Sequence, residues 1–395
     1  YNTDYEIGQD NLRTWGMDIH NPVFVISALL VLFFVVGTLM FPGDAKEAFD
    51  GSKAWSIDNF DWFFLVAGNI FVLFCLALIV LPVGKIRLGG IDAKPEFSTL
   101  SWFAMLFAAG MGIGLMFWSV AEPTAYFTDW WGTPLNVEKE TPEAARKAMG
   151  ATMFHWGLHP WAIYAVVALS LAFFTYNKGL PLTIRSAFFP FIKDRSWGWF
   201  GHLIDVVAVL ATIFGLATSL GFGAQQAAGG LKFLFDIPNT INTQIAIIIG
   251  VTAVAIVSVV RGLDGGVKVL SNINMVLAVI LLAFVIIVGQ GLTIFSGLLN
   301  TSGAYLENLI PLSNWIGRED DKFFHGWTVF YWAWWISWSP FVGMFIARIS
   351  KGRTVREFLL AVIFVPLIVT VLWFSTFGET ALFLSLIHIS EPTRH

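Results

Sequence analysis

The sequence has 395 residues, of which 56% are hydrophobic and only 13% are charged, and its formal net charge is −4 at pH 7. Soluble domains usually carry about 25% charged residues, so the composition excludes an ordinary soluble protein and predicts a polytopic membrane protein. The weakly acidic balance gives no reason to expect nucleic acid as a partner. The single cysteine, Cys75, excludes a disulfide within the chain.

The first predicted segment, residues 1–21, is polar and acidic and lacks the basic start and apolar core of a signal peptide. A helix needs about 20 apolar residues to cross a bilayer, and runs of that length predict nine membrane-spanning helices. Strands are disfavoured, because a barrel strand would have about 10 residues of alternating character. The nine predicted spans are 22–42, 60–84, 100–120, 149–174, 200–222, 241–260, 269–296, 327–350 and 357–378.

Lys and Arg residues in the short loops predict the orientation of these helices. With the N-terminus inside, the inner segments hold 14 Lys and Arg residues and the outer loops hold 8. The outer loops are also acid-rich, as in the sequence GREDD at 317–321. We therefore predict a cytoplasmic N-terminus.

Two of the predicted spans contain residues that interrupt helices. The third has Gly110, Gly112 and Gly114 near its middle, and each glycine weakens a helix by about 1 kcal/mol relative to alanine. Close helix packing and an unwound segment are both open interpretations, and unwound carbonyls can coordinate a cation. The eighth span has Pro340 followed by Gly343, which predicts a kink and a second interruption.

The spacing of these two helices predicts internal repeats. Transporters often place their site where two interrupted helices in corresponding positions face each other. The third and eighth spans are five positions apart in the order of the spans, so we predict five-helix repeats that start at these two spans. The second repeat would then need three more helices. The last residues, LSLIHISEPTRH at 384–395, resemble a translated sequencing adapter, and we expect a non-native tail at that point, with a short natural tail as the alternative.

Aromatic residues are concentrated inside two of the spans. The sequence YWAWWISWSP at 331–340 has four tryptophans, and FHWGLHPWAIY at 154–164 has two tryptophans and a tyrosine. Aromatic faces that converge form a cage for a cation that cannot donate hydrogen bonds, such as a quaternary ammonium group. Packing in the core or against lipid is the alternative. The residues concerned are Trp156, Trp161, Tyr164, Trp332, Trp334, Trp335 and Trp338.

Three titratable residues in the spans could have other roles. Asp205 lies inside the fifth span, where it would handle ions or protons, or would be a near-interface residue paired with His202 or a backbone donor. His155 and His159 lie one turn apart, but no third ligand has a matching spacing, so we predict no metal site.

Four motifs together resemble the betaine/carnitine/choline transporter family. They are GMGIGLMFWSVAEP (110–123), MFHWGLHPWAIY (153–164), RGLDGGVKVLSNIN (261–274) and WAWWISWSPFVGMFIARIS (332–350). The resemblance extends over residues 20–383. It implies an all-α polytopic membrane protein with a leucine-transporter-like fold of inverted five-helix repeats, here truncated after about nine of twelve helices.

The resemblance also implies a division of the chain. The expected parts are a cytoplasmic segment (1–21), two peripheral helices (22–99), a first repeat (100–296), an external amphipathic connection (297–326), the start of a second repeat (327–383) and the tail (384–395).

The resemblance implies roles for the aromatic and glycine residues. Trp156, Trp161, Tyr164 and Trp335 would form the box around a trimethylammonium group, while Trp334 and Trp338 would line the neighbouring path. The substrate would also be flanked by the flexible segment that contains Gly110, Met111, Gly112 and Gly114.

Sodium sites are implied in the same way. The backbone of Ala108 and Met111 would contribute to one sodium site. Hydroxyls of the fifth helix would contribute to another, and the candidates are Thr212, Thr218 and Ser219. The alternative is that each hydroxyl bonds its own helix backbone.

The expected function is uptake of a quaternary-ammonium solute, most of all glycine betaine, by Na⁺ symport with alternating access. No enzyme motif is found, and no cofactor is expected apart from Na⁺ as the coupling ion. The fifth span has no Arg or Lys that could replace sodium. The resemblance implies a homotrimer in a bacterial inner membrane, with a role in osmoprotection. Alternatives are a choline or carnitine carrier that is proton-coupled or an exchanger, a channel, or a receptor that binds quaternary amines without moving them.

Overall fold

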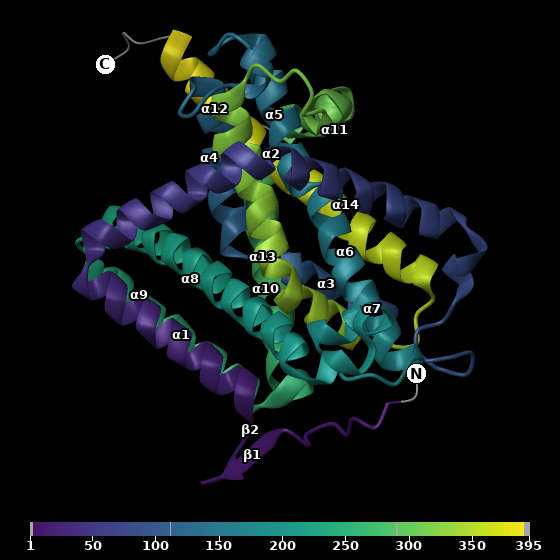
Figure 1. The fold of residues 1–395 in the computed structure, drawn as a ribbon. Coiled ribbons are helices and arrows are strands. Elements are labelled where there is room, and N and C mark those ends of the chain that lie inside the picture. The colour runs from purple at the N-terminus through teal and green to yellow at the C-terminus, as the bar shows by residue number, and fades with distance from the viewer. Residues whose placement is uncertain (1–2, 111, 290, 391–395) are drawn as a thin grey trace.

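The computed structural model describes residues 3–110, 112–289 and 291–390, and it is mostly helical (Figure 1). The first half contains β1 (Asn11–Thr14), β2 (Met17–His20), α1 (Asn21–Met40), α2 (Pro42–Val80), η1 (Pro82–Lys85), α3 (Thr99–Gly110), α4 (Ile113–Thr128), η2 (Pro134–Asn136), α5 (Pro142–Trp156), α6 (Leu158–Ala172), η3 (Phe173–Asn177), η4 (Ile184–Phe188), α7 (Phe189–Ile192) and η5 (Lys193–Trp197). The second half contains α8 (Trp199–Phe235), α9 (Ile241–Val260), η6 (Leu263–Val267), α10 (Lys268–Val288), α11 (Gly291–Ser313), α12 (Asp321–Phe323), η7 (Phe324–Val329), α13 (Phe330–Ile349) and α14 (Val355–Ser390).

Within the described residues, seven helices are long and apolar enough to cross a membrane, or eight if the bent pair α3–α4 counts as one span. The prediction of nine was therefore too high by this criterion, although a helix lies at each of the nine places. The difference is α13, which has the length of a span but contains many tryptophans and serines that reduce its apolar character.

Several predicted boundaries were wrong. Helix α2 begins at Pro42 rather than near residue 60, and α8 continues to Phe235 rather than ending near residue 222. The predicted connection 297–326 is mostly helical, because α11 extends to Ser313 and packs against α5 and α14. Helices here continue into residues outside the apolar runs, so the length of an apolar run does not give the ends of a helix.

The N-terminal segment contains a small antiparallel hairpin, which the all-α expectation missed. Strands β1 and β2 pair from Asn11 opposite His20 to Thr14 opposite Met17. The two connecting residues, Trp15 and Gly16, both have positive φ, at 50° and 75°. Two-residue hairpins favour this geometry because its twist matches that of the strands.

Arg185 connects this N-terminal segment to the helix bundle through hydrogen bonds and an ion pair. Its guanidinium is buried, donates to the Tyr5 hydroxyl over 2.9 Å and lies 3.2 Å from Oδ2 of Asp205. Asp205 also accepts from the backbone N–H of Arg185. The predicted backbone donor for Asp205 is therefore confirmed, whereas His202 contacts Arg185 rather than Asp205.

The core of the bundle is centred on α6 and α13, which make the most extensive contact between described helices. Gly343 allows this close approach, since a Cβ there would lie 2.8 Å from Cγ1 of Val167. Two clusters of buried apolar side chains lie along these helices, and Trp335 packs against both. Small residues at such a contact let helix backbones approach closely.

The predicted interruption of the third span is confirmed. Helix α3 ends at Gly110, α4 begins at Ile113, and the two segments are bent by 55°. Gly112 has an extended backbone conformation before α4, with φ −112° and ψ −169°. Met111 lies outside the described residues.

The predicted interruption at Pro340 was wrong, because α13 continues through this proline without a break. The proline cannot donate to the carbonyl of Ile336, but the Ser339 hydroxyl donates to that oxygen over 2.7 Å. Membrane helices tolerate proline where a neighbouring hydroxyl satisfies the freed carbonyl. The irregular turn lies earlier, in the π-helical segment η7.

Candidate functional site: an aromatic cavity

A cavity of about 240 Å³ lies between α3, α4, α5, α6, α8, α13 and α14. Eight of the ten predicted substrate-binding residues line it, and of the other two, Gly110 ends α3 and Met111 is not described. The complete lining is Ala109, Gly112, Gly114, Leu115, Trp156, Trp161, Tyr164, Leu216, Ser219, Leu220, Trp334, Trp335, Trp338 and Thr370.

Trp335 is at the centre of the aromatic lining. Its ring is stacked on that of Trp334, with centroids 5.6 Å apart and an angle of 7° between the planes. Trp156 and Tyr164 stand nearly perpendicular to it, at 5.0 Å and 5.6 Å. Trp161 is edge-on to Tyr164 at 5.7 Å. Aromatic rings from three helices, α5, α6 and α13, thus meet around one space, and cation–π binding uses the faces of such rings.

Gly157 separates the two parts of the fourth span and thereby places these rings. Helix α5 ends at Trp156 and α6 begins at Leu158. A Cβ at Gly157 would lie 2.5 Å from the carbonyl oxygen of Met153 and 2.7 Å from the hydroxyl of Tyr305. That hydroxyl accepts a hydrogen bond from the Leu158 N–H over 2.9 Å. The predicted span was treated as one helix, so this break was missed.

Gly114 brings the broken helix against two of the tryptophans. A Cβ at this position would lie 3.2 Å from Cη2 of Trp156 and 3.4 Å from Cη2 of Trp334. The absence of a side chain at Gly114 therefore admits both indoles to the cavity. On the other side, Gly215 of α8 contacts Trp338, because a Cβ there would lie 2.6 Å from Cε3 of that ring.

Trp332 belongs to the core rather than to the cavity. It is fully buried and packs against Phe154 and His159, with ring centroids at 5.0 Å and 5.5 Å. The packing alternative therefore holds for this one tryptophan of the segment 331–340. Nε2 of His159 donates a hydrogen bond to Oδ1 of Asn69 over 2.9 Å.

The three hydroxyls predicted for the sodium site on the fifth helix, those of Thr212, Thr218 and Ser219, do not line one cavity in this conformation. Ser219 lines the aromatic cavity, whereas Thr212 lines a separate cavity near Arg185. Thr218 is exposed. Thr212 and Thr218 each donate to the carbonyl four residues earlier in α8, over 2.8 Å and 3.0 Å, which is the alternative role considered for these hydroxyls. Ala108, near the end of α3, is partly buried.

Sequence reasoning missed a buried carboxylate behind the box. Glu122 of α4 is fully buried, and its Oε2 accepts from Nε1 of Trp156 and from the Tyr331 hydroxyl, each over 2.6 Å. Its Oε1 accepts from the Tyr126 hydroxyl over 2.6 Å and lies 3.1 Å from Nδ1 of His155. The predicted third span ended at residue 120, which placed Glu122 outside the membrane region. In the sequence, Glu122 and Tyr126 are four residues apart, one helical turn, and this spacing was the available sign that the carboxylate has a hydrogen-bond partner.

His155 connects Glu122 to the aromatic cavity: its side chain contacts the carboxylate, and its backbone carbonyl bonds Trp335. Its Nε2 lies 3.0 Å from the hydroxyl of Thr328, and its carbonyl accepts from Nε1 of Trp335 over 2.9 Å. With its proton on Nδ1, the ring donates to Glu122 and accepts from Thr328. The side chain is therefore engaged in this network. Within the described residues, no group of three or more possible metal ligands is found.

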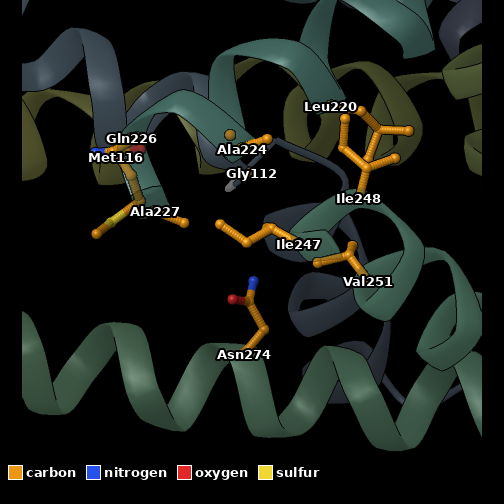
Figure 2. A pocket seen from close by; sticks show the side chains of 11 residues that line it. Gly112, Met116, Leu220, Ala224, Gln226, Ala227, Ile247, Ile248, Val251 and Asn274 are labelled. Atoms are coloured by element: carbon orange, nitrogen blue, oxygen red, sulfur yellow. The ribbon is translucent and has the colours of Figure 1, made fainter. Parts of the chain in front are cut away.

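A second cavity of about 420 Å³ lies between α4, α8, α9 and α10 (Figure 2). Gly112 and Leu220 line both this space and the aromatic cavity. The rest of its lining is mostly apolar, and the amide of Asn274 points into it from α10 (Figure 2). The broken segment thus stands between two neighbouring cavities.

Together, these features are those of a polytopic helical membrane protein that encloses an aromatic cavity beside a broken helix. Residues 22–393 match the family model described as BCCT, betaine/carnitine/choline family transporter. The chain therefore belongs to this family of transporters.

Named relatives agree with this assignment. The chain is 65% identical to glycine betaine transporter 1 of Vibrio parahaemolyticus over 96% of this chain and 73% of the relative. It is 61% identical to a glycine betaine/proline/choline/ectoine transporter of the same organism, over 96% of this chain and 68% of the relative. It is 47% identical to the glycine betaine transporter OpuD of Bacillus subtilis, over 91% of this chain and 70% of the relative.

Proposed function

We propose that this protein imports glycine betaine as a secondary active transporter. The observation that carries the proposal is the cavity in which Trp156, Tyr164 and Trp335 surround one space. A trimethylammonium group has no hydrogen to donate, so aromatic faces are the partners it can use. The relatives named as glycine betaine transporters support the same substrate.

Sodium is the proposed coupling ion, and alternating access is the proposed mechanism. Helix α3 ends beside the cavity, and the carbonyls of a last helical turn have no partner within the helix, which makes them candidate ligands of a cation. The hydroxyl of Ser219 lines the same cavity from α8. Since only one of the two predicted interruptions is present, movement would centre on the α3–α4 break.

The finer architecture is proposed as well. Residues 100–296 would form one five-helix repeat and residues 327–383 would begin a second, inverted one. The bundle would lie in a bacterial inner membrane with a cytoplasmic N-terminus, as a homotrimer. The β1–β2 hairpin lies at the opposite end of the bundle from the end of α14, which supports placing these two segments on opposite sides (Figure 1).

The proposal is tested by measuring uptake of labelled glycine betaine in cells that have no betaine carrier of their own. The full-length gene is expressed, and uptake is compared in NaCl and KCl at equal osmolality. Saturable uptake that collapses in KCl is expected. Uptake that does not depend on sodium would contradict the coupling, and transport of choline or carnitine alone would contradict the substrate. Binding without uptake would indicate a receptor, and uptake that does not saturate would indicate a channel.

Ser219→Ala is expected to raise the sodium concentration for half-maximal betaine uptake by about threefold to tenfold. A hydroxyl ligand to a cation is taken to contribute on the order of 1 kcal/mol, the size of a typical net hydrogen bond. The readout is uptake against sodium concentration at fixed betaine. Ser302→Ala is the matched control, because that hydroxyl bonds the carbonyl of Leu298 in α11. An unchanged sodium dependence in the Ser219 variant would exclude this hydroxyl as a ligand.

A further inference from the structure

Glu122 is a buried carboxylate whose partners include no lysine or arginine. It is 0% exposed, and its donors are two tyrosine hydroxyls, an indole N–H and an imidazole. An ionised carboxylate only accepts hydrogen bonds and has about four acceptor sites, which fits this set of four. The hydrogen bonding of the carboxylate is thus complete, but none of these groups carries a permanent positive charge that would cancel its own.

Within the described residues, no lysine or arginine lies against Glu122. Among the ion pairs of the described residues, Glu122 is joined to His155 and to no lysine or arginine. Arg318, a nearby guanidinium, is already paired with Asp320, with Nε and Oδ1 2.6 Å apart. Buried charges in proteins are usually paired, because removing an ion from water is costly. A positively charged partner for Glu122 is therefore expected from a group other than the described lysines and arginines, such as a bound cation.

Trp156 connects this carboxylate to the cavity. Its Nε1 donates to Oε2 of Glu122 over 2.6 Å, while the Cη2 edge of the same ring approaches Gly114 beside the cavity. A hydrogen bond from an indole N–H to a carboxylate polarises the ring and increases its negative potential. The attraction between a cation and an aromatic face depends on that potential.

The same carboxylate also bonds a second aromatic residue, Tyr331, which packs against two tryptophans of the cavity. The Tyr331 hydroxyl donates to Oε2 of Glu122, and the Tyr331 ring is stacked against Trp334 at 5.9 Å and Trp335 at 6.4 Å. One carboxylate from the broken span thus bonds to residues of both aromatic segments, α5 and α13.

We propose that Glu122 is the counter-charge of the transported cation, and that it acts through Trp156 as a positioning residue. This inference rests on the proposed function, since it takes the aromatic cavity to be the site of a quaternary ammonium group. It adds an acidic group to a site whose aromatic residues would otherwise supply only quadrupoles. The charge of Glu122 makes the cavity selective for a cationic head over a neutral one of the same shape.

The test compares two competitors against uptake of labelled glycine betaine. One is unlabelled glycine betaine, and the other is 3,3-dimethylbutanoate, which has the same shape but an uncharged head. Glu122→Gln is expected to raise the concentration of glycine betaine for half-maximal inhibition by about tenfold. The same variant leaves inhibition by 3,3-dimethylbutanoate unchanged or strengthens it. A purely structural defect would weaken inhibition by both competitors together. The ratio of their half-maximal inhibitory concentrations therefore reports the effect of the Glu122 charge.

Trp156→Phe is the second variant, because it retains an aromatic ring and removes the donor to Glu122. Both substitutions remove the same hydrogen bond, so their effects on betaine affinity are not expected to add. The double variant Glu122→Gln/Trp156→Phe should bind betaine about as well as whichever single variant has the lower affinity. Glu307→Gln is the matched control, since Glu307 forms an exposed pair with Arg146. The thermal midpoint of each purified variant shows whether it is folded.

Each outcome decides between the inference and the proposed function. No betaine uptake by the unaltered protein would contradict the proposed function, and tetramethylammonium binding, measured by calorimetry on the purified protein, would then provide the same comparison of variants. Normal uptake with an unchanged ratio in the folded Glu122→Gln variant would overturn the inference alone. If that variant is not folded, the Trp156→Phe variant provides the test. A tenfold loss in the preference for glycine betaine over 3,3-dimethylbutanoate is expected only if the hydrogen bond from residue 156 to Glu122 contributes to cation binding.

Discussion

Trp335→Ala is expected to raise the KM for glycine betaine uptake by about tenfold to thirtyfold. The Trp335 ring contacts Trp334, Trp156 and Tyr164, so its removal takes away one aromatic face and the support of three others. One well-placed face contributes about 0.5–2 kcal/mol, and each 1.4 kcal/mol is a factor of ten in affinity. The measurement is the initial rate of uptake against betaine concentration.

Two further variants make this prediction specific. Trp335→Phe keeps an aromatic face but loses the donor to the His155 carbonyl, and we expect its KM to rise only about threefold. Trp130→Ala is the control, because that indole is 57% exposed and does not line the cavity. If Trp335→Ala transported betaine with an unchanged KM, the aromatic cavity would not be the substrate site.

Gly157→Ala is expected to reduce betaine uptake by tenfold or more and to lower the thermal midpoint by several degrees. The new Cβ would lie 2.5 Å from the Met153 carbonyl and 2.7 Å from the Tyr305 hydroxyl, so backbone and ring must move. Forcing extra volume into a packed interior typically costs about 1–3 kcal/mol. Trp156 precedes this glycine directly, so the strain changes the position of its ring relative to Trp335.

The control for this substitution is Gly230→Ala in α8, where a Cβ would meet nothing within 4 Å. Alanine is the better helix former by about 1 kcal/mol, so this variant is expected to keep or slightly raise its thermal midpoint and to transport normally. Measurements on purified protein and in cells separate the two effects. Normal uptake by a folded Gly157→Ala variant would show that the break between α5 and α6 is not needed for the box.

The sequence predicted the members of the aromatic site better than it predicted the helices that hold them. Tryptophans in the middle of a span, such as Trp335, lie outside the interfacial belt where such residues usually occur, so their pattern already suggested a ligand. The three glycines of the third span also indicated its break correctly, because glycine weakens a helix whatever surrounds it. The break at Gly157 gave no comparable signal, since a single glycine in an apolar run is compatible with a continuous helix.

At Pro340 the sequence predicted an interruption that the structure does not have. Proline removes a helix hydrogen bond, and the sequence therefore predicted an interruption. The Ser339 hydroxyl replaces the missing donor at the Ile336 carbonyl, and α13 remains continuous. Such a replacement depends on the rotamer of one side chain, which residue types alone do not specify.

What the sequence determined by itself is the class of protein, its membrane helices and the residue types of the cage, because apolar length and aromatic content are local properties. The tertiary structure decided which of those residues meet. It brought Ser219 to the cavity and left Thr218 exposed, and it buried Glu122 against Trp156. Contacts between residues far apart in the chain depend on how helices pack, and a buried carboxylate is recognised as such only when all its neighbours are in place.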